Sequence, residues 1–440
     1  WNPENVEKLK YWEEMAGMNI VFQLDGERKY IYEHIAIKKR WMKQCRENQS
    51  DYQALCLVSG QKKPIARLHP SIKGIKNAQS SGASIVSFNL DSFCSYNKKQ
   101  SFNAPISEDV TFNYTTALNN LLRFDSRKKV QIGDATTVFW AKGKTPVEGF
   151  LKDILDPQDN QTDLGDLRRF LEAMREGKMP KVIENTKNMK FYILGLSPNA
   201  SRLSVRFWYV STVEDISRKI GQHFKDLAIN KNYDNDPEFP GMWHLLRETA
   251  VQRNSKNISP LLTGTFVRSM LTGLRYPSGI LTAVLERVRA DQKINYLRAA
   301  LIKAYLVRNS RFQNKEEREV ISMSLDKEEK NIGYRLGRLF AILEKAQKDA
   351  VPGANTTIKD RYYGSASATP AIVFPQLLRL AQHHIQKSDY GINTDKKIED
   401  VIQDIQKFPS HLSLEDQGIF ALGYYHQKQD FYKKSEKKEE

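Results

Sequence analysis

Lysines and amide side chains gather in one stretch of this 440-residue sequence, between Pro64 and Asn103. Amides can hydrogen-bond to base edges and lysines can meet phosphates, so the mixture suits a loop that contacts nucleic acid in both ways. Gly74 and Gly82 let the backbone bend or approach a ligand closely. A solvated surface loop is the alternative interpretation. We predict nucleic-acid contact at Lys73, Lys76, Asn77, Gln79, Ser80, Ser81, Lys98, Lys99, Gln100 and Asn103.

The charge of the whole chain favours a polyanionic partner. Lysine and arginine number 68 against 52 aspartates and glutamates, which gives a formal net charge of +16 and a pI of about 9.4. Counterion release from phosphates rewards binding by such a surface. Charge alone leaves open a basic protein without a special partner.

Enzyme motifs are missing from the sequence, which contains no Walker lysine loop, GxGxxG, HExxH or GxSxG. Cys45, Cys56 and Cys94 lack CxxC spacing, so they predict neither a zinc set nor a disulfide framework. We interpret Asp134 as a turn residue before a strand, because one carboxylate makes a poor Mg²⁺ site. We therefore expect a non-catalytic protein without metal or cofactor. A nuclease site built from distant carboxylates stays open.

Cysteine usage fits a reducing compartment, and no signal peptide is visible. No apolar run reaches membrane-spanning length, and the mean hydropathy is −0.58. These observations predict a soluble, cytoplasmic protein that does not contact membranes.

The elements that must position the basic stretch read as a mixed α/β domain over residues 1–144. Asp25-Gly26 is a strong hairpin turn. Residues 54–60, 64–69 and 83–89 are β-rich, with Gln61-Lys62-Lys63 separating the first two runs. A helix is expected over 112–123, followed by a strand in TTVFWA, residues 136–141.

Residues 145–240 read as an acidic connection followed by a strand–strand–helix unit. The connection leads into a helix with Leu167, Phe170, Leu171 and Met174 inward. Residues 191–196 and 202–210 then predict two strands. The second has the period of a half-buried strand, in which the inward positions Leu203, Val205, Phe207 and Tyr209 alternate with Ser204, Arg206 and Trp208. The following helix should bury Ile216, Ile220, Phe224 and Leu227. This unit is compatible with a ferredoxin-like or RNA-recognition fold, and core packing explains its aromatics better than base stacking does.

Residues 241–430 are predicted to form helices, and 431–440 a charged tail. One stripe in this part comprises Leu336, Leu339, Phe340 and Leu343, which should leave Arg335, Arg338 and Lys345 off the core. The expected fold class is therefore α+β: a mixed α/β N-terminal and middle portion followed by an all-α C-terminal helical bundle.

An ordered series of long phrases resembles one family. The phrases include RLHPSIKG, AQSSGASIVSFN, GDATTVFWA, FYILGLSPNASRLSVRFW and RYYGSASATPAIVFPQLLRLAQHH. Together they are similar to the large subunit of the type I-C CRISPR surveillance complex, the Csd-type Cascade protein. The likeness runs from about residue 25 to about residue 386. Family members carry a further segment before Trp1, so the chain is expected to lack the family's N-terminal segment.

The resemblance implies a role beside a CRISPR RNA. The subunit would inspect target duplex for a protospacer-adjacent motif, help to open it and stabilise the R-loop, while guide pairing supplies sequence specificity. It also implies partners: target double-stranded DNA and its displaced strand, the backbone and guide-handle-binding subunits, and a recruited helicase–nuclease. An RNA- or protein-binding assembly scaffold without DNA readout is the alternative.

The helical part resembles the separate small subunit of such complexes, whose helices line the path of the displaced strand. That subunit can arise from an internal start in the same message, for which Met323 is the candidate here. Candidate phosphate contacts in this part are Arg268, Arg275, Arg287, Arg335, Arg338, Arg361 and Arg379. Exposed solubilising charge is the alternative role for each.

Overall fold

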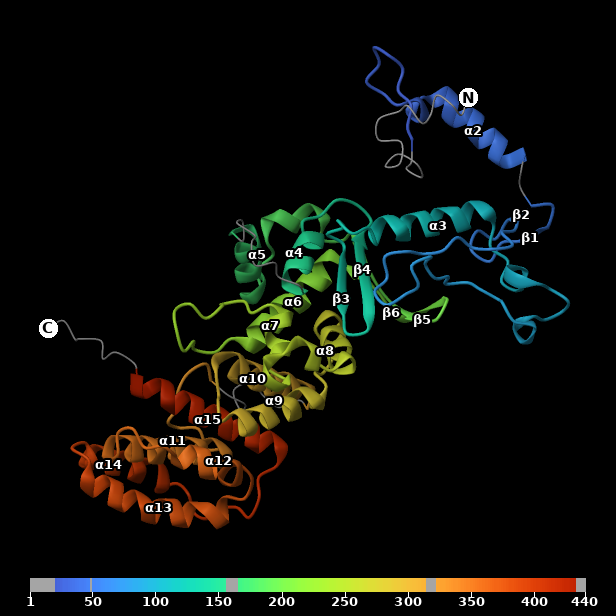
Figure 1. Ribbon diagram of the computed structural model, residues 1–440. Coiled ribbons are helices and arrows are strands. Elements are labelled where there is room, and N and C mark those ends of the chain that lie inside the picture. The colour runs from blue at the N-terminus through green and yellow to red at the C-terminus, as the bar shows by residue number, and fades with distance from the viewer. Residues whose placement is uncertain (1–19, 48–49, 156–164, 314–321, 433–440) are drawn as a thin grey trace, which may run out of the picture. The chain divides into compact units, whose positions relative to one another are not determined.

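The computed structural model of the protein describes residues 20–47, 50–155, 165–313 and 322–432 (Figure 1). Two compact units divide the chain: unit 1 comprises Trp1–Ile72 and Ser84–Leu118, and unit 2 comprises Lys73–Ala83 and Asn119–Glu440. The predicted domain boundaries near residues 144 and 240 lie inside unit 2 and stay predictions. Most of the predicted charged tail lies outside the described residues.

The α+β class is confirmed. Small antiparallel sheets lie in the N-terminal and middle portions, and after Thr212 the regular elements within the described residues are helices. Among those helices, none combines the length and apolar character that crossing a membrane requires.

Unit 1 contains a helix, a short hairpin and most of a second helix. The predicted turn at Asp25-Gly26 closes a loop in which Gln23 bridges Tyr30. Helix α2 spans Ile35–Glu47, and α3 spans Glu108–Leu121. Strand β1 (Gln53–Leu55) pairs antiparallel with β2 (Lys62–Pro64), so Lys62 and Lys63 belong to the second strand, where a separating turn was expected.

The strand predicted over residues 83–89 is wrong. Ala83 and Ser84 form only isolated bridges, and residues 85–89 have no regular structure. β-branched residues such as Ile85 and Val86 favour a strand chiefly where neighbouring strands supply packing partners. Within the described residues, no strand pairs with this segment.

Unit 2 is built on a four-stranded antiparallel sheet with the strand order β3-β4-β5-β6. The strands are β3 (Lys129–Ile132), β4 (Ala135–Ala141), β5 (Lys190–Asn199) and β6 (Arg202–Thr212). Each strand pairs with the next along the chain, so the sheet is a meander, which corrects the ferredoxin-like or RNA-recognition interpretation. Strand β3 was not predicted.

One face of this sheet is the core face. Phe139, Phe191 and Ile193 are fully buried on it, and helices α4 (Val147–Leu155), α6 (Val213–Leu227) and α8 (Pro260–Thr272) contact its strands. Helix α5 (Gly165–Arg175) packs against α6. The apolar positions predicted for α5 and α6 are all buried, which confirms the helical periodicity read from the sequence.

The chain continues through α7 (Met242–Arg247), α9 (Ser278–Asp291) and α10 (Tyr296–Phe312). Buried arginines tie these helices to their neighbours. Arg308 of α10 donates to Asp226 of α6 at 2.9 Å, and Arg298 donates to Glu248 at 3.0 Å. All four side chains are almost fully buried. Each charged group therefore needs its oppositely charged partner, because an unpaired charge inside the protein is strongly unfavourable.

Five helices end the described chain: α11 (Ile332–Ala350), α12 (Ile358–Ala368), α13 (Pro370–Lys387), α14 (Gly391–Ile402) and α15 (Leu414–Tyr432) (Figure 1). Helices α11 and α15 cross closely, because glycines face backbone there. A Cβ at Gly337 would lie 2.0 Å from the Phe420 carbonyl oxygen, and one at Gly423 would lie 2.1 Å from that of Tyr334.

Candidate nucleic-acid interface

The N-terminal part of the predicted site forms one anchored loop, Lys73–Ala83, which we call the motif loop. Two hydrogen bonds fix its backbone to the rest of unit 2: Lys73 N–H donates to Asn119 Oδ1 at 2.8 Å, and Lys76 N–H donates to Thr136 Oγ1 at 3.1 Å. Gly74 has φ +81°, and a Cβ there would lie 2.5 Å from the Leu122 carbonyl oxygen. Only glycine fits this close approach.

The motif loop presents its polar side chains to solvent. All six predicted contacts in it are exposed, while Ile75 and Ala83 are buried beneath them. The backbone of Asn77 is left-handed, with φ 64°, a conformation that asparagine tolerates better than most residues. Lys76 also lines a cavity of about 350 Å³, together with Trp243 and Lys256. A rigid backbone therefore carries free side chains.

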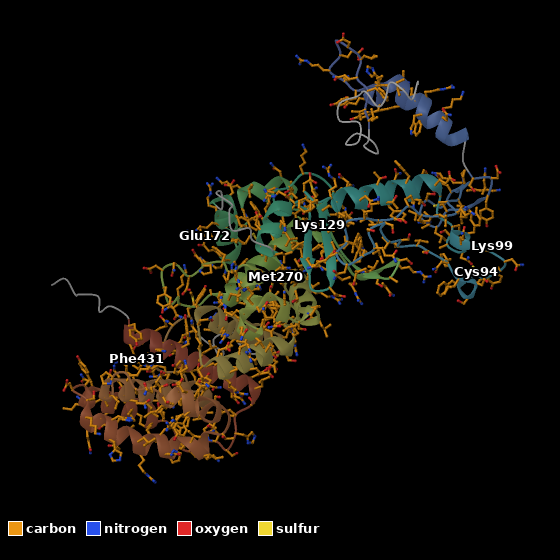
Figure 2. All side chains as sticks on the ribbon, viewed as in Figure 1. Cys94, Lys99, Lys129, Glu172, Met270 and Phe431 are labelled. Carbon is orange, nitrogen blue, oxygen red and sulfur yellow. The ribbon has the colours of Figure 1, made fainter. Side chains whose placement is uncertain are left out.

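The remaining predicted contacts lie in unit 1, on a second loop at residues 95–103. Lys98 and Lys99 are exposed, and Figure 2 shows Lys99 extending from the chain. Asn103 has an internal task instead: its Nδ2 donates to the carbonyls of Lys98 at 2.8 Å and Gln100 at 2.9 Å, and its Oδ1 accepts from Ser95 N–H at 2.9 Å. Those bonds occupy both amide protons, so they favour a structural role for Asn103.

Sequence reasoning missed an aromatic cluster on the sheet. Trp140, Tyr192 and Trp208 come from three adjacent strands, and their ring centroids are 5.4 to 5.9 Å apart. Side chains alternate across a strand, so Trp140 lies on the same face as Thr136, to which the motif loop is bonded. Trp208 is 52% exposed. The cluster and the motif loop therefore share one sheet face.

A signal for the cluster exists in the sequence. Trp208 stands in the outward phase of the predicted strand, together with Arg206, where a tryptophan has no core to enter. The register of β5 against β6 shifts between Gly195 and Leu196, so that Gly195 pairs with Phe207 and Leu196 with Val205. This β-bulge at Arg206 breaks the simple alternation, which is why the predicted inward position of Val205 is wrong: it is 52% exposed.

The seven arginines of the helical part fall into three groups. Arg268, Arg275, Arg361 and Arg379 are exposed, although Arg275 also donates to the Phe312 carbonyl at 2.9 Å. Arg287 and Arg335 are half-buried and pair with Asp291 and Asp404.

Arg338 lies inside the bundle, which corrects its predicted place off the core. It is 5% exposed and donates to the Lys327 carbonyl at 3.1 Å and to Gln427 Oε1 at 3.3 Å. Burial lowers the pKa of this guanidinium. A phosphate cannot reach it in this arrangement.

Asp134 lies in the turn between β3 and β4, as predicted. It pairs with Arg206 at 2.8 Å and accepts from Ser197 Oγ at 3.1 Å. Among the described residues, no three His, Cys, Asp or Glu side chains gather where they could hold a metal ion.

These features define a basic α+β protein that presents lysines, amides and aromatic rings on one sheet face. Its family follows from comparison with family models: the model for the CRISPR-associated protein Cas_Csd1 matches residues 1–432. The chain therefore belongs to the Cas_Csd1 family of CRISPR-associated proteins. No curated protein matches the sequence.

Proposed function

We propose that this protein is the large subunit of a type I-C CRISPR surveillance complex and that it reads the protospacer-adjacent motif in target DNA. The observation that carries the proposal is the motif loop, in which exposed lysines and amides stand on a backbone bonded to the sheet. Lysines that meet phosphates would set the position of the protein along the duplex, and the amides of Asn77 and Gln79, one and three residues after Lys76, can reach base edges. Membership of a CRISPR-associated family supplies the context.

The sheet face beside the loop fits the next step, in which the duplex opens. Aromatic rings accept unstacked bases without regard to their sequence. The cluster of Trp140, Tyr192 and Trp208 would hold the first bases that separate, while the motif loop holds the duplex next to them. Lys190, exposed and two residues before Tyr192 on β5, adds positive charge to the same face.

The helical part would line the path of the displaced strand. Its exposed arginines, Arg268, Arg275, Arg361 and Arg379, are the candidates for phosphate contact that the structure leaves accessible. Helices α11 to α15 pack chiefly on one another. A product that begins at Met323 would contain all five, in keeping with an internal start for the small subunit. We also propose that the protein supports recruitment of a helicase–nuclease, and this part of the proposal rests only on membership of the family.

The test is a binding assay with the complete complex and a target library whose flanking bases are randomised. We expect the bound fraction to be enriched in one short flanking motif. An assembly scaffold without DNA readout would retain targets regardless of flank, and that result would overturn motif reading. Incubation of the chain with DNA and Mg²⁺ or Mn²⁺ tests the alternative of a nuclease, for which we expect intact DNA.

A further inference from the structure

A cavity of about 650 Å³ lies in the helical part of unit 2, between the segments before and after Met323. Loop residues Asn232, Tyr233 and Asp236 line one side, together with the start of α10 at Asn295 and Tyr296. Lys359 of α12 and the α15 residues Tyr424, Lys428 and Tyr432 line the other. We call this space the Lys359 cavity.

Lys359 is the unusual group in this cavity. It is 8% exposed, and its Nζ lies 5.0 Å from the centroid of the Tyr424 ring. Within the described residues, no oxygen accepts a hydrogen bond from this ammonium and no carboxylate pairs with it. Burial and the neighbouring Lys428 lower its pKa to about 8. A buried ammonium without an anion is costly.

The nearby carboxylates serve other groups. Glu344 accepts from Lys348 at 2.5 Å and also from the Tyr424 hydroxyl. Asp236 accepts from the backbone N–H groups of Asn232 and Tyr233, both at 3.0 Å. Lys428, whose Nζ lies 5.5 Å from the same Tyr424 ring, adds a second cation without a carboxylate partner in the described part of the chain. The cavity therefore has an excess of positive charge.

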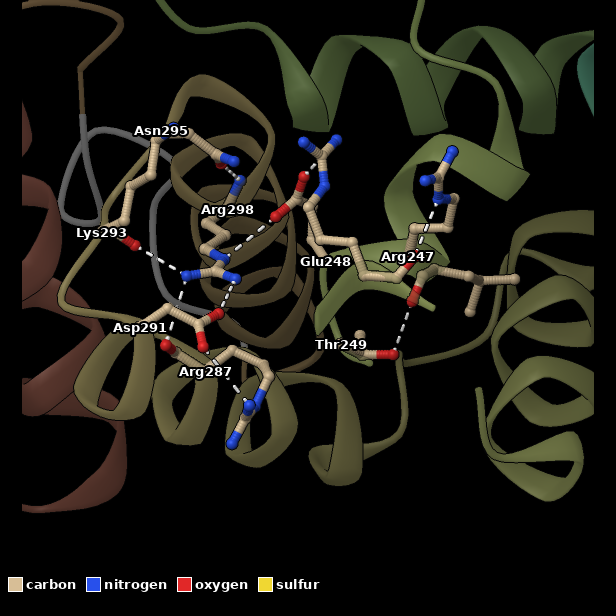
Figure 3. Close-up of polar contacts among 10 residues, drawn as sticks. Arg247, Glu248, Thr249, Arg287, Asp291, Lys293, Asn295 and Arg298 are labelled. Carbon is tan, nitrogen blue, oxygen red and sulfur yellow. Dashed lines mark hydrogen bonds and ion pairs between the residues drawn. The ribbon is translucent and has the colours of Figure 1, made fainter. Parts of the chain in front are cut away.

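The wall formed by α10 is rigid and also favours anions. Asn295 caps the helix by accepting from Arg298 N–H at 2.9 Å, and the Arg298 side chain donates to the Lys293 carbonyl at 2.9 Å and pairs with Asp291 and Glu248 (Figure 3). Helix α10 has 17 residues. The N–H groups of its first turn carry partial positive charge.

We propose that the Lys359 cavity holds a phosphate group of a single-stranded nucleic acid, with bases on either side stacking on Tyr233 and Tyr432. Those two rings line the cavity and are 71% and 69% exposed. The inference rests on the proposed function, in which the helical part follows the displaced strand. It adds a phosphate-binding site to that path. The site needs the residues before Met323 as well as those after it, because both line the cavity.

The test uses the full chain and a labelled oligothymidylate, whose binding is measured over a series of salt concentrations. Lys359→Met should weaken binding and lower the slope of log K against log salt by about 0.7, the value for one phosphate contact on a single strand. The matched control is Lys396→Met on α14, an exposed lysine outside the cavity, which should change neither quantity. The midpoint temperature of thermal unfolding, measured without the oligonucleotide, should be unchanged or higher for Lys359→Met, because the variant removes a buried charge.

Two further arms keep the test decisive. Tyr432→Ala should weaken binding and leave the salt slope unchanged, because it removes a stacking ring and no charge. Lys428→Met provides a second charge variant should Lys359→Met fold poorly. Inorganic phosphate at constant ionic strength should compete weakly, and full competition would assign the cavity to a small anion and overturn the proposal.

The outcomes separate the two proposals. If the unaltered chain bound no oligonucleotide, the role of the helical part in the proposed function would fail. If it bound while Lys359→Met and Lys428→Met kept its affinity and salt slope, the cavity proposal alone would be overturned.

Discussion

Asn77 and Gln79 are the residues on which motif reading depends. Each amide offers a donor pair and an acceptor, and both are exposed on a loop whose backbone is bonded to α3 and β4. A side chain on such a backbone loses only its own rotamer freedom when it meets a base edge.

Replacing both amides in the Asn77→Ala, Gln79→Ala double variant should weaken binding to targets with the correct motif by about 1–3 kcal/mol for each base contact that is lost. Binding to DNA without the motif should change little. The measurement is the affinity of the assembled complex for the two targets. Trp208→Ala is the comparison variant, since loss of a stacking ring should weaken both targets alike. Equal losses for the double variant would show that the loop does not discriminate.

His426 shows how burial fixes a protonation state. It is fully buried, and its Nδ1 lies 2.8 Å from the Tyr334 hydroxyl. That hydroxyl accepts from Asp326 N–H, so its own proton can go to Nδ1 of a neutral ring. Burial, together with the charge of nearby Lys303, lowers the pKa of His426 from 6.5 to about 4.

The free energy of unfolding should consequently fall as pH is lowered from about 6.5 to about 4. In that window the unfolded chain binds a proton that the folded ring rejects, and the full loss attributable to His426 is about 3 kcal/mol. Chemical denaturation at a series of pH values checks this for the native chain and for His426→Gln, which cannot titrate. Other groups contribute equally to both chains, so the difference between the two curves isolates His426. Parallel curves would contradict the prediction.

At the scale of elements, periodicity predicted the helices well. The apolar residues predicted to face the core in α5, α6 and α11 are all buried. The prediction succeeds because the 3.6-residue period of a single helix decides which side chains share its buried face. The β5–β6 hairpin was also foreseen. Local pattern sufficed in these cases.

The misses arise where a second segment decides the outcome. Ile85 and Val86 have strand character and no pairing partner in the described chain. Arg338 lies inside the bundle because its guanidinium donates hydrogen bonds there to Gln427 Oε1 and to the Lys327 carbonyl. The exposed motif loop was predicted from its composition, whereas its attachment to Thr136 and the aromatic cluster beside it needed the sheet register.

The crossing of α11 and α15 allows a prediction about packing. Gly337→Ala should lower the free energy of unfolding by about 1–3 kcal/mol, because its methyl group would force two backbones apart. Gly364→Ala on α12 is the control: nothing lies within 4 Å of its new methyl, so alanine's higher helix propensity should raise stability by up to about 1 kcal/mol. Denaturant unfolding distinguishes them. Equal effects at the two glycines would argue against a tight crossing.

At the scale of the whole molecule, the proposed internal start predicts two products from one message. Met323 is 54% exposed and precedes five helices that pack chiefly on one another. Mass spectrometry of the purified complex should find a species that begins at Met323, and Met323→Leu should remove it while the full chain persists. A single intact species, unaltered by the substitution, would defeat the idea.

Helix α15 also contacts two helices that precede Met323 in the chain. Besides α11 it rests on α9 and α10, where a Cβ at Gly418 would lie 3.2 Å from side-chain carbons of Leu281 and Ile302. A polypeptide starting at Met323 lacks both of those helices, so this apolar side of α15 would meet water. Such a product would expose an apolar patch, so its copies would associate with one another or with another subunit. The number of copies in the complex would then depend on how many are needed to bury that apolar surface.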